Sequence, residues 1–332
     1  MRQSRFVIPV IIALAVTIRA QAQVRGGDLP GPLPLFPPDN WWNTDISSAP
    51  VDPNSAAFIG FIGTSRGLHP DFGGDSGDGI YGFPYIVVGA TQPLVPVTFD
   101  YDDESDLGAP GRPPGYPIPE QAKTEPKWIE GGLAGNDLNA GGDRHMLIVD
   151  RDNRILYELY ALRWRGRWEA GSGAVFPLDS NARRPEGWTS ADAAGLAILP
   201  GLVRYDEVYG DAPIRHAFRV TVRATNGYVF PASHRAGSTS GALPMGARLR
   251  LKASKDIGAF PAPLQRIFQA MKTYGLIVAD NGSDMYVSGT YDTRWDNDVL
   301  NPAFAALKAG DFEVVQLGWQ PQARGRARAV RH

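Results

Sequence analysis

Apolar and polar residues alternate with a period of two along several stretches of the chain, a pattern that predicts β-strands. The clearest pair, 144–150 and 154–164, is instead two largely apolar runs typical of buried strands, and residues 151–153 supply a polar turn between them. An Asn281-Gly282 pair between two apolar runs predicts a hairpin over 275–289. Further strands are expected at 81–102, 214–224, 244–254 and 311–317.

Helical spacing is confined to short segments, and residues 103–143 form a long loop rich in proline and glycine. Thr189 followed by Asp192 resembles the capping box that starts a helix. Short helices are expected at 54–67, 189–195, 264–275 and 301–310. The chain shows no internal repeat and no interior linker. The pattern therefore predicts a mainly β fold, a single-domain β-sandwich or jelly roll with a few short helices.

The two ends of the chain differ from the middle. Residues 1–22 combine two arginines, an apolar run and an Ala-Gln-Ala end, which is typical of a cleaved signal peptide, with an uncleaved anchor as the alternative. Residues 23–40 are a Pro-rich extended lead-in, 41–320 the β-rich domain, and 321–332 a basic tail expected to be disordered. We therefore expect a secreted or periplasmic protein with no transmembrane segment after cleavage.

Composition narrows the chemistry. The 332 residues include no cysteine, so disulfides, thiolate metal sites and a cysteine nucleophile are excluded. The formal net charge of −2 gives no reason to expect nucleic acid as a partner, and nothing in the sequence indicates an oligomeric state. Motifs for a phosphate loop and for a nucleophile elbow are missing.

Two polar residues stand among core-facing positions of the clearest strand pair. Counting outward from a two-residue turn at Asp152-Asn153 places Leu147 opposite Glu158 and puts His145 on the same face. In the strand at 214–224, the same alternation directs His216 inward and the arginines, Arg219 among them, toward water.

Three interpretations of His145, Glu158 and His216 follow. In the first, Glu158 is the acid or nucleophile of a glycoside hydrolase, supported by the histidines and by a second carboxylate from Glu104 or Asp106. In the second, the three residues bind a transition metal in a metal-dependent enzyme. In the third, they are core polar groups that have found hydrogen-bond partners.

Neighbouring residues would complete such a site. The side chains expected to bind substrate are Arg144, Tyr160, Trp188 and Trp295. The acidic stretch 99–106 could bind calcium through Asp103 and Asp106, although hydrolysis itself requires no cofactor. The expected partner is a polysaccharide or oligosaccharide, and a non-catalytic glycan-binding or envelope structural protein is the remaining alternative.

Several segments together resemble a family of exported, β-rich bacterial proteins. The segments are PDNWWNTDIS, GGDRHMLIVDRDNRILYEL, RPEGWTSADAAGLAILPGLVRYDEV, PMGARLRLKAS, YGLIVADNGS and TRWDND. The resemblance covers about 40 to 300 and implies a single exported domain. It carries no activity and no catalytic residue to this chain.

Overall fold

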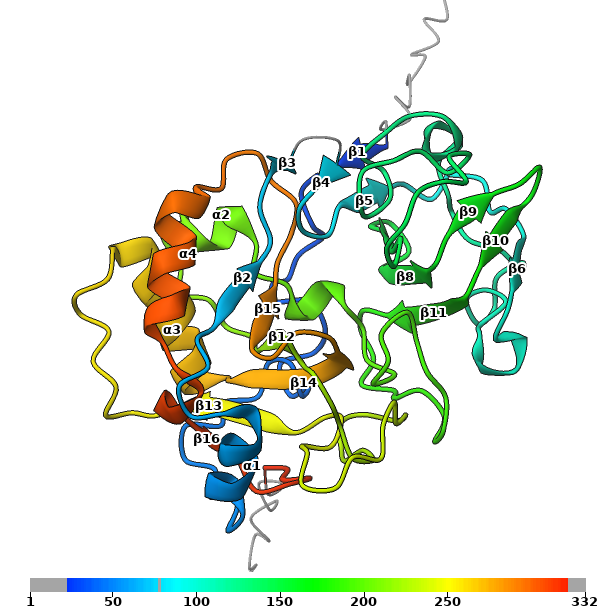
Figure 1. The fold of residues 1–332 in the computed structure, drawn as a ribbon. Helices are drawn as coiled ribbons and strands as arrows, with labels where there is room; N and C mark the ends of the chain where they lie inside the picture. The colour runs from blue at the N-terminus through cyan, green and yellow to red at the C-terminus, as the bar shows by residue number, and fades with distance from the viewer. Residues whose placement is uncertain (1–22, 77–78, 322–332) are drawn as a thin grey trace, which may run out of the picture.

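The computed structural model describes residues 23–76 and 79–321. The predicted signal peptide and all but the first residue of the basic tail lie outside this range. The protein is mostly sheet with few helices, 24% strand against 16% helix, in several mixed sheets (Figure 1). This confirms the mainly β prediction. A jelly roll is not confirmed, because β5 (Tyr85–Val88) and β7 (Met146–Asp150) pair in parallel, whereas jelly rolls are antiparallel.

The first sheet has five strands in the order β1-β5-β7-β8-β11. Its other strands are β1 (Val24–Arg25), β8 (Ile155–Tyr160) and β11 (Ser172–Pro177). Leu147 lies opposite Glu158, as the predicted register requires. Both faces of this sheet are covered: Leu147 and Leu156 belong to the main hydrophobic core, and Met146 and Tyr157 to a second cluster beneath the 103–143 loop.

The second sheet has six strands in the order β16-β13-β14-β12-β15-β2. They are β16 (Phe312–Val314), β13 (Arg248–Leu251), β14 (Leu276–Asn281), β12 (Phe218–Val222), β15 (Tyr286–Ser288) and β2 (His69–Asp71). The predicted 275–289 hairpin is wrong, because β12 lies between β14 and β15 and pairs with both. All of β12 is buried, so its backbone groups need partners on both sides.

Smaller elements surround the two sheets. Short strands form a three-stranded sheet, β6 (Val97–Phe99), β10 (Trp168–Ala170) and β9 (Arg163–Trp164), and a pair, β3 (Asp75–Ser76) with β4 (Gly79–Ile80). The α-helices are α1 (Ser55–Ile62), α2 (Tyr205–Val208), α3 (Ala262–Thr273) and α4 (Asn297–Ala306). Short 3₁₀ turns occur at Asp102–Glu104, Glu120–Lys123, Leu199–Gly201 and Ala309–Asp311. No helix within the described ranges has the length and apolarity needed to cross a membrane.

Two of the helix predictions need correction. The last helix starts at Asn297 rather than 301, because Asp296 caps it by accepting from the Asp298 backbone N–H over 3.0 Å, so Pro302 lies inside the helix. Residues 189–195 do not form a helix. There the carboxylate of Asp192 binds the guanidinium of Arg219 instead of capping a helix end.

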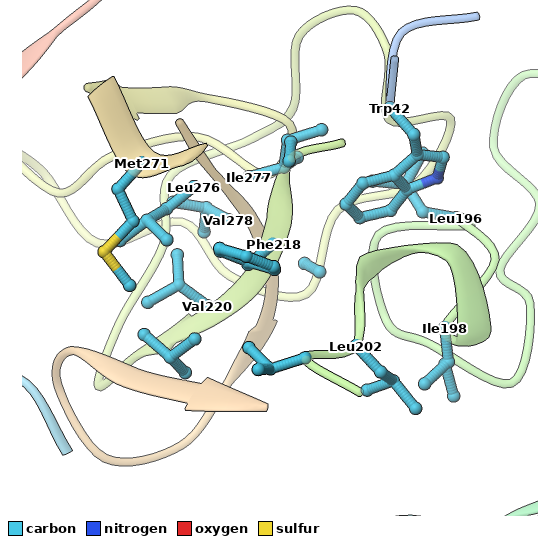
Figure 2. Close-up of a cluster of buried hydrophobic side chains, with 14 of the residues drawn as sticks. Trp42, Leu196, Ile198, Leu202, Phe218, Val220, Met271, Leu276, Ile277 and Val278 are labelled. Atoms are coloured by element: carbon cyan, nitrogen blue, oxygen red, sulfur yellow. The ribbon is translucent and has the colours of Figure 1, made fainter. Parts of the chain in front are cut away.

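The main core joins both sheets. In Figure 2, Phe218 and Val220 of β12 and Leu276 to Val278 of β14 pack near Met271 of α3, and Trp42, Leu196, Ile198 and Leu202 lie on the other side of β12. Helices α3 and α4 cover the side of the six-stranded sheet that faces away from the first sheet (Figure 1). The loop 189–202 therefore lies between the sheets, where it can present polar groups to a cavity.

Candidate functional site

A cavity of about 390 Å³ opens where the first sheet meets the end of β14. Its walls come from seven separate parts of the chain. The lining residues are Tyr101, Glu104, Asp143, His145, Tyr160, Ser172, Thr189, Ser190, Ala191, Asp192, Ala193, His234, Asp280 and Asn281. We call it the acidic cavity because four of these residues carry carboxylates.

His145 immediately precedes β7 and forms part of the cavity wall as a cation. Its Nδ1 donates to Oε2 of Glu130 over 2.6 Å, and its Nε2 donates to the Ala191 carbonyl oxygen over 2.9 Å. Burial would lower the pKa of His145, but the Glu130 carboxylate outweighs it and raises that pKa to about 9. With both ring nitrogens donating, His145 has no lone pair with which to accept a proton from a substrate.

Arg219 of β12 lies under the cavity and links its carboxylates. Its Nε and Nη2 donate to the two carboxylate oxygens of Asp192, each over 2.8 Å, and Nη2 also reaches Oδ2 of Asp280 over 3.0 Å. Nη1 donates to the Ser288 hydroxyl over 2.7 Å. The prediction that Arg219 faces water is wrong, because only 3% of the residue is exposed. Its two carboxylate partners make burial of this charge tolerable.

Asp280 is the carboxyl group best suited to proton donation. Its side chain is 24% exposed, and burial raises its pKa to about 6, against the lowering effect of Arg219. Oδ1 accepts from the Asn281 backbone N–H over 2.7 Å, which fixes the carboxyl at the end of β14. A carboxyl group with such a pKa is substantially protonated at mildly acidic pH and can reach a substrate in the cavity.

His234 supplies the complementary group. Its Nδ1 donates to the Ala193 carbonyl oxygen over 2.8 Å, because a carbonyl oxygen only accepts. This fixes the tautomer of the neutral ring and leaves Nε2 with its lone pair as a proton acceptor. The half-buried His234 lines the same cavity as Asp280. The cavity thus combines an acid with a base, whereas His145 and Arg219 provide fixed positive charge.

Glu158 is not part of this cavity. It is fully buried, and its carboxylate accepts hydrogen bonds of 2.8–3.0 Å from the backbone N–H groups of Ile198 and Leu199, at the start of a 3₁₀ turn. Burial raises the pKa of Glu158 to about 7. The inward direction expected from the sequence is correct. The role of leading acid is not supported, because the carboxyl group has no contact with solvent or with the cavity.

His216 lies in a different place again. Its Nε2 is 3.0 Å from both carboxylate oxygens of Glu207, which also forms an ion pair with Arg204. The structure therefore does not bring His145, Glu158 and His216 together. In residues 23–76 and 79–321, no group of three or more histidine and acidic side chains is placed to hold a metal ion.

The acidic residues of the stretch 99–106 lie in different environments, one of them in the cavity and another in an ion pair within the protein. Glu104 lines the cavity and accepts from the Thr189 backbone N–H over 2.9 Å. Asp106 accepts from the guanidinium of Arg184 and from the Val175 backbone N–H, so its charge is compensated within the protein. Asp103 is exposed and lies within the 3₁₀ turn Asp102–Glu104.

Of the four residues expected to bind substrate, only Tyr160 lines the cavity. Arg144 is buried and donates to the carbonyl oxygens of Leu162 and Ala134, each over 3.0 Å. Trp188 lies under the guanidinium of Arg184 at 5.3 Å. Trp295 is a core residue whose indole N–H donates to the Thr290 carbonyl oxygen over 2.9 Å. Those three expectations therefore do not match the cavity.

Sequence reasoning missed four residues that define the site, Glu130, Asp192, His234 and Asp280. The sequence does contain a signal for Asp280, because this carboxylate directly follows the apolar run LIVA, which is typical of a buried strand. Asp192 was assigned to a helix cap that does not form. Glu130 and His234 lie in irregular segments, where no periodicity indicates a direction for the side chain.

Comparison of the chain with models of protein families, with curated proteins and with solved structures finds no match. The interpretation of the site therefore depends on its own geometry.

Proposed function

We propose that the protein is an exported hydrolase of glycans, with its catalytic centre in the acidic cavity rather than at Glu158. One observation carries the proposal: Asp280, with a pKa of about 6, shares a solvent-accessible cavity with His234, whose Nε2 is free to accept a proton. An acid and a base held on separate elements are the minimum that hydrolysis of a stable bond requires. Residues 1–22, with the pattern of a signal peptide, support export.

The lining of the cavity favours a hydroxyl-rich substrate. Carboxylates at Asp143 and Glu104 can accept hydrogen bonds from sugar hydroxyl groups, and Ser172 and Ser190 add hydroxyl groups to the wall. The rings of Tyr101 and Tyr160 offer apolar faces against which a sugar can pack. A volume of about 390 Å³ is at the small end of ligand sites and suits one or two sugar rings.

In this proposal, Asp280 transfers its proton to the glycosidic oxygen as the bond from that oxygen to the anomeric carbon breaks. His234 Nε2 accepts a proton from a water molecule, whose oxygen forms the new bond to the anomeric carbon. The positive charge that develops on the sugar is stabilised by the carboxylates in the wall. Because water attacks directly in one displacement, the product is expected to have inverted anomeric configuration.

The test is an activity screen of residues 23–332 against plant, fungal and bacterial polysaccharides, with new reducing ends as the readout. Asp280→Asn and His234→Gln are the test variants, and Glu158→Gln is the matched control, since it removes a buried carboxylate outside the cavity. New reducing ends that disappear in both test variants and persist in the control support the proposal. Binding of a glycan without any product would favour a non-catalytic binding protein instead.

A further inference from the structure

A second and larger cavity, of about 550 Å³, lies at the other end of the segment 230–234. Phe230 and Pro231 line this cavity, and His234 lines the acidic one. Its most informative lining residues are Asp39, Trp41, Arg183, Phe230, Arg248 and Trp319. We call it the arginine cavity. Nothing in the proposed hydrolysis uses it.

Arg248 of β13 is the unusual group in this cavity. The residue is only 8% exposed, yet none of the described carboxylates lies within ion-pair distance of it. Among the described residues its one hydrogen-bond acceptor is the Trp41 carbonyl oxygen, reached from Nη2, and its buried Nε has no partner. Burial lowers the pKa of Arg248 to about 9, which still leaves it charged at neutral pH. A buried charge without a counter-ion costs several kcal/mol.

Arg250, two residues along the same strand, is a buried arginine with a structural role, and its charge is compensated within the protein. It is also 8% exposed, but its Nε and Nη2 donate to Oε1 of Glu313 over 2.9 and 2.7 Å. Its Nη1 donates to backbone carbonyl oxygens, among them those of Ser47 and Ala49. The contrast shows that no described residue compensates the charge of Arg248 as Glu313 compensates that of Arg250, so an anionic ligand in the cavity would meet an unpaired guanidinium.

The other lining residues of the arginine cavity indicate which further chemical groups such a ligand carries. Trp41 and Phe230 meet edge to face with ring centroids 6.0 Å apart, and the buried indole N–H of Trp41 has no acceptor in the part of the chain that the structure describes. The guanidinium of Arg183 lies 5.6 Å from the Phe230 ring centroid, and its charge is paired with Glu186 over 2.7 Å, so Arg248 is the arginine left to meet an anion. Asp39, which accepts from the Asn181 side-chain amide over 2.8 Å, can also accept from a hydroxyl group. A carboxylate for Arg248, a ring for the aromatic walls and hydroxyls for Asp39 are combined in a uronic acid.

We infer that the arginine cavity binds a uronic acid residue, with its carboxylate held by the planar fork of Arg248 and its ring against Trp41 and Phe230. The fork geometry favours a carboxylate because two parallel N–H groups match its two oxygens. The inference stands on this cavity alone and does not require catalysis in the acidic cavity.

The test is isothermal titration calorimetry of residues 23–332 with D-galacturonic acid, and with neutral D-galactose as the matched ligand control. We expect galacturonic acid to bind at least about tenfold more tightly than galactose. Arg248→Gln should remove that preference without lowering the melting temperature, because it also removes an uncompensated buried charge. Arg248→Lys keeps the charge but not the fork and should weaken galacturonic acid binding as well.

Arg250→Gln is the control variant, expected to lower the melting temperature and to leave the affinity for galacturonic acid unchanged. Asp280→Asn should also bind galacturonic acid as the parent does, which separates this inference from the proposed hydrolysis. Failure of galacturonic acid to bind, equal binding of the two sugars, or unchanged binding by Arg248→Gln would each overturn the inference.

Discussion

The guanidinium of Arg219 donates to both carboxylate oxygens of Asp192, each over 2.8 Å, and only 3% and 1% of these residues are exposed. This pair joins β12 of the six-stranded sheet to the loop 189–193, which forms one wall of the acidic cavity. The same guanidinium also holds Asp280. One buried cation therefore positions both a cavity wall and the proposed acid.

Loss of that cation is expected to destabilise the fold. Arg219→Ala leaves Asp192 as a buried charge without its partner, and the free energy of unfolding should fall by about 3–5 kcal/mol. Arg167→Ala is the control, since Arg167 pairs with Glu169 at the surface with 70% of its side chain exposed, and its effect should be below about 1 kcal/mol. Denaturant unfolding measures both variants. Equal effects would contradict the structural role of Arg219.

Glu158 is expected to make stability depend on pH. Its pKa is about 7 in the folded protein and ordinarily 4.5, so the folded state holds the proton more tightly. Protonated Glu158 therefore contributes about 3 kcal/mol to the free energy of unfolding. This contribution is fully present below pH 4.5 and is lost as the pH rises through 7. Glu158→Gln is neutral throughout. Its stability relative to the parent should rise between pH 5 and pH 7.5, as measured by denaturant unfolding, and parallel pH dependences would contradict this account.

The Glu130 carboxylate is expected to keep His145 protonated. Without it, burial and the positive charge of Arg219 both lower the pKa of His145, and only Asp143 acts in the opposite direction. Glu130→Gln should therefore bring the pKa of His145 from about 9 to below 6.5, as followed by NMR titration of the imidazole. Glu207→Gln is the control because Glu207 contacts His216 instead. A high pKa of His145 that survives in Glu130→Gln would show that another group sustains it.

Activity is expected to decline as the proposed acid loses its proton. Because the pKa of Asp280 is about 6, kcat/KM on a cleaved glycan should fall as pH rises above that value. The descending limb should be missing from the residual activity of Asp280→Asn. A pH profile that stays flat from pH 5 to 8 would indicate that Asp280 does not donate the proton.

The sequence predicted local pairing well where two apolar runs lie close together in the chain. The register that places Leu147 opposite Glu158 is confirmed because a short polar turn joins the two strands and fixes the counting outward from it. Prediction from the sequence failed where contacts between distant parts of the chain determine the structure. No local pattern indicates that β12 inserts between β14 and β15, because the pairing partners are more than fifty residues apart. The charge of Arg219 predicted exposure, and only the distant carboxylates of Asp192 and Asp280 explain its burial.

The candidate site shows the same division. His145 and Tyr160 were found because they lie at the ends of regular strands, where the direction of a side chain can be counted. His234 and Glu130 come from irregular segments and enter the site through backbone turns that periodicity does not describe. Glu158 was correctly placed inward, but burial alone did not reveal that its partners are two backbone N–H groups.

The most direct test of the account compares the initial rates of product formation by Asp280→Asn and Glu158→Gln on the glycan that the parent cleaves best. Both substitutions replace a carboxyl group of raised pKa with an amide, and only Asp280 reaches the acidic cavity. We expect Asp280→Asn to lose about a hundredfold or more in kcat, and Glu158→Gln to retain most of the parent rate. A large loss in Glu158→Gln with near-parent activity in Asp280→Asn would contradict the account and return the chemistry to the strand pair.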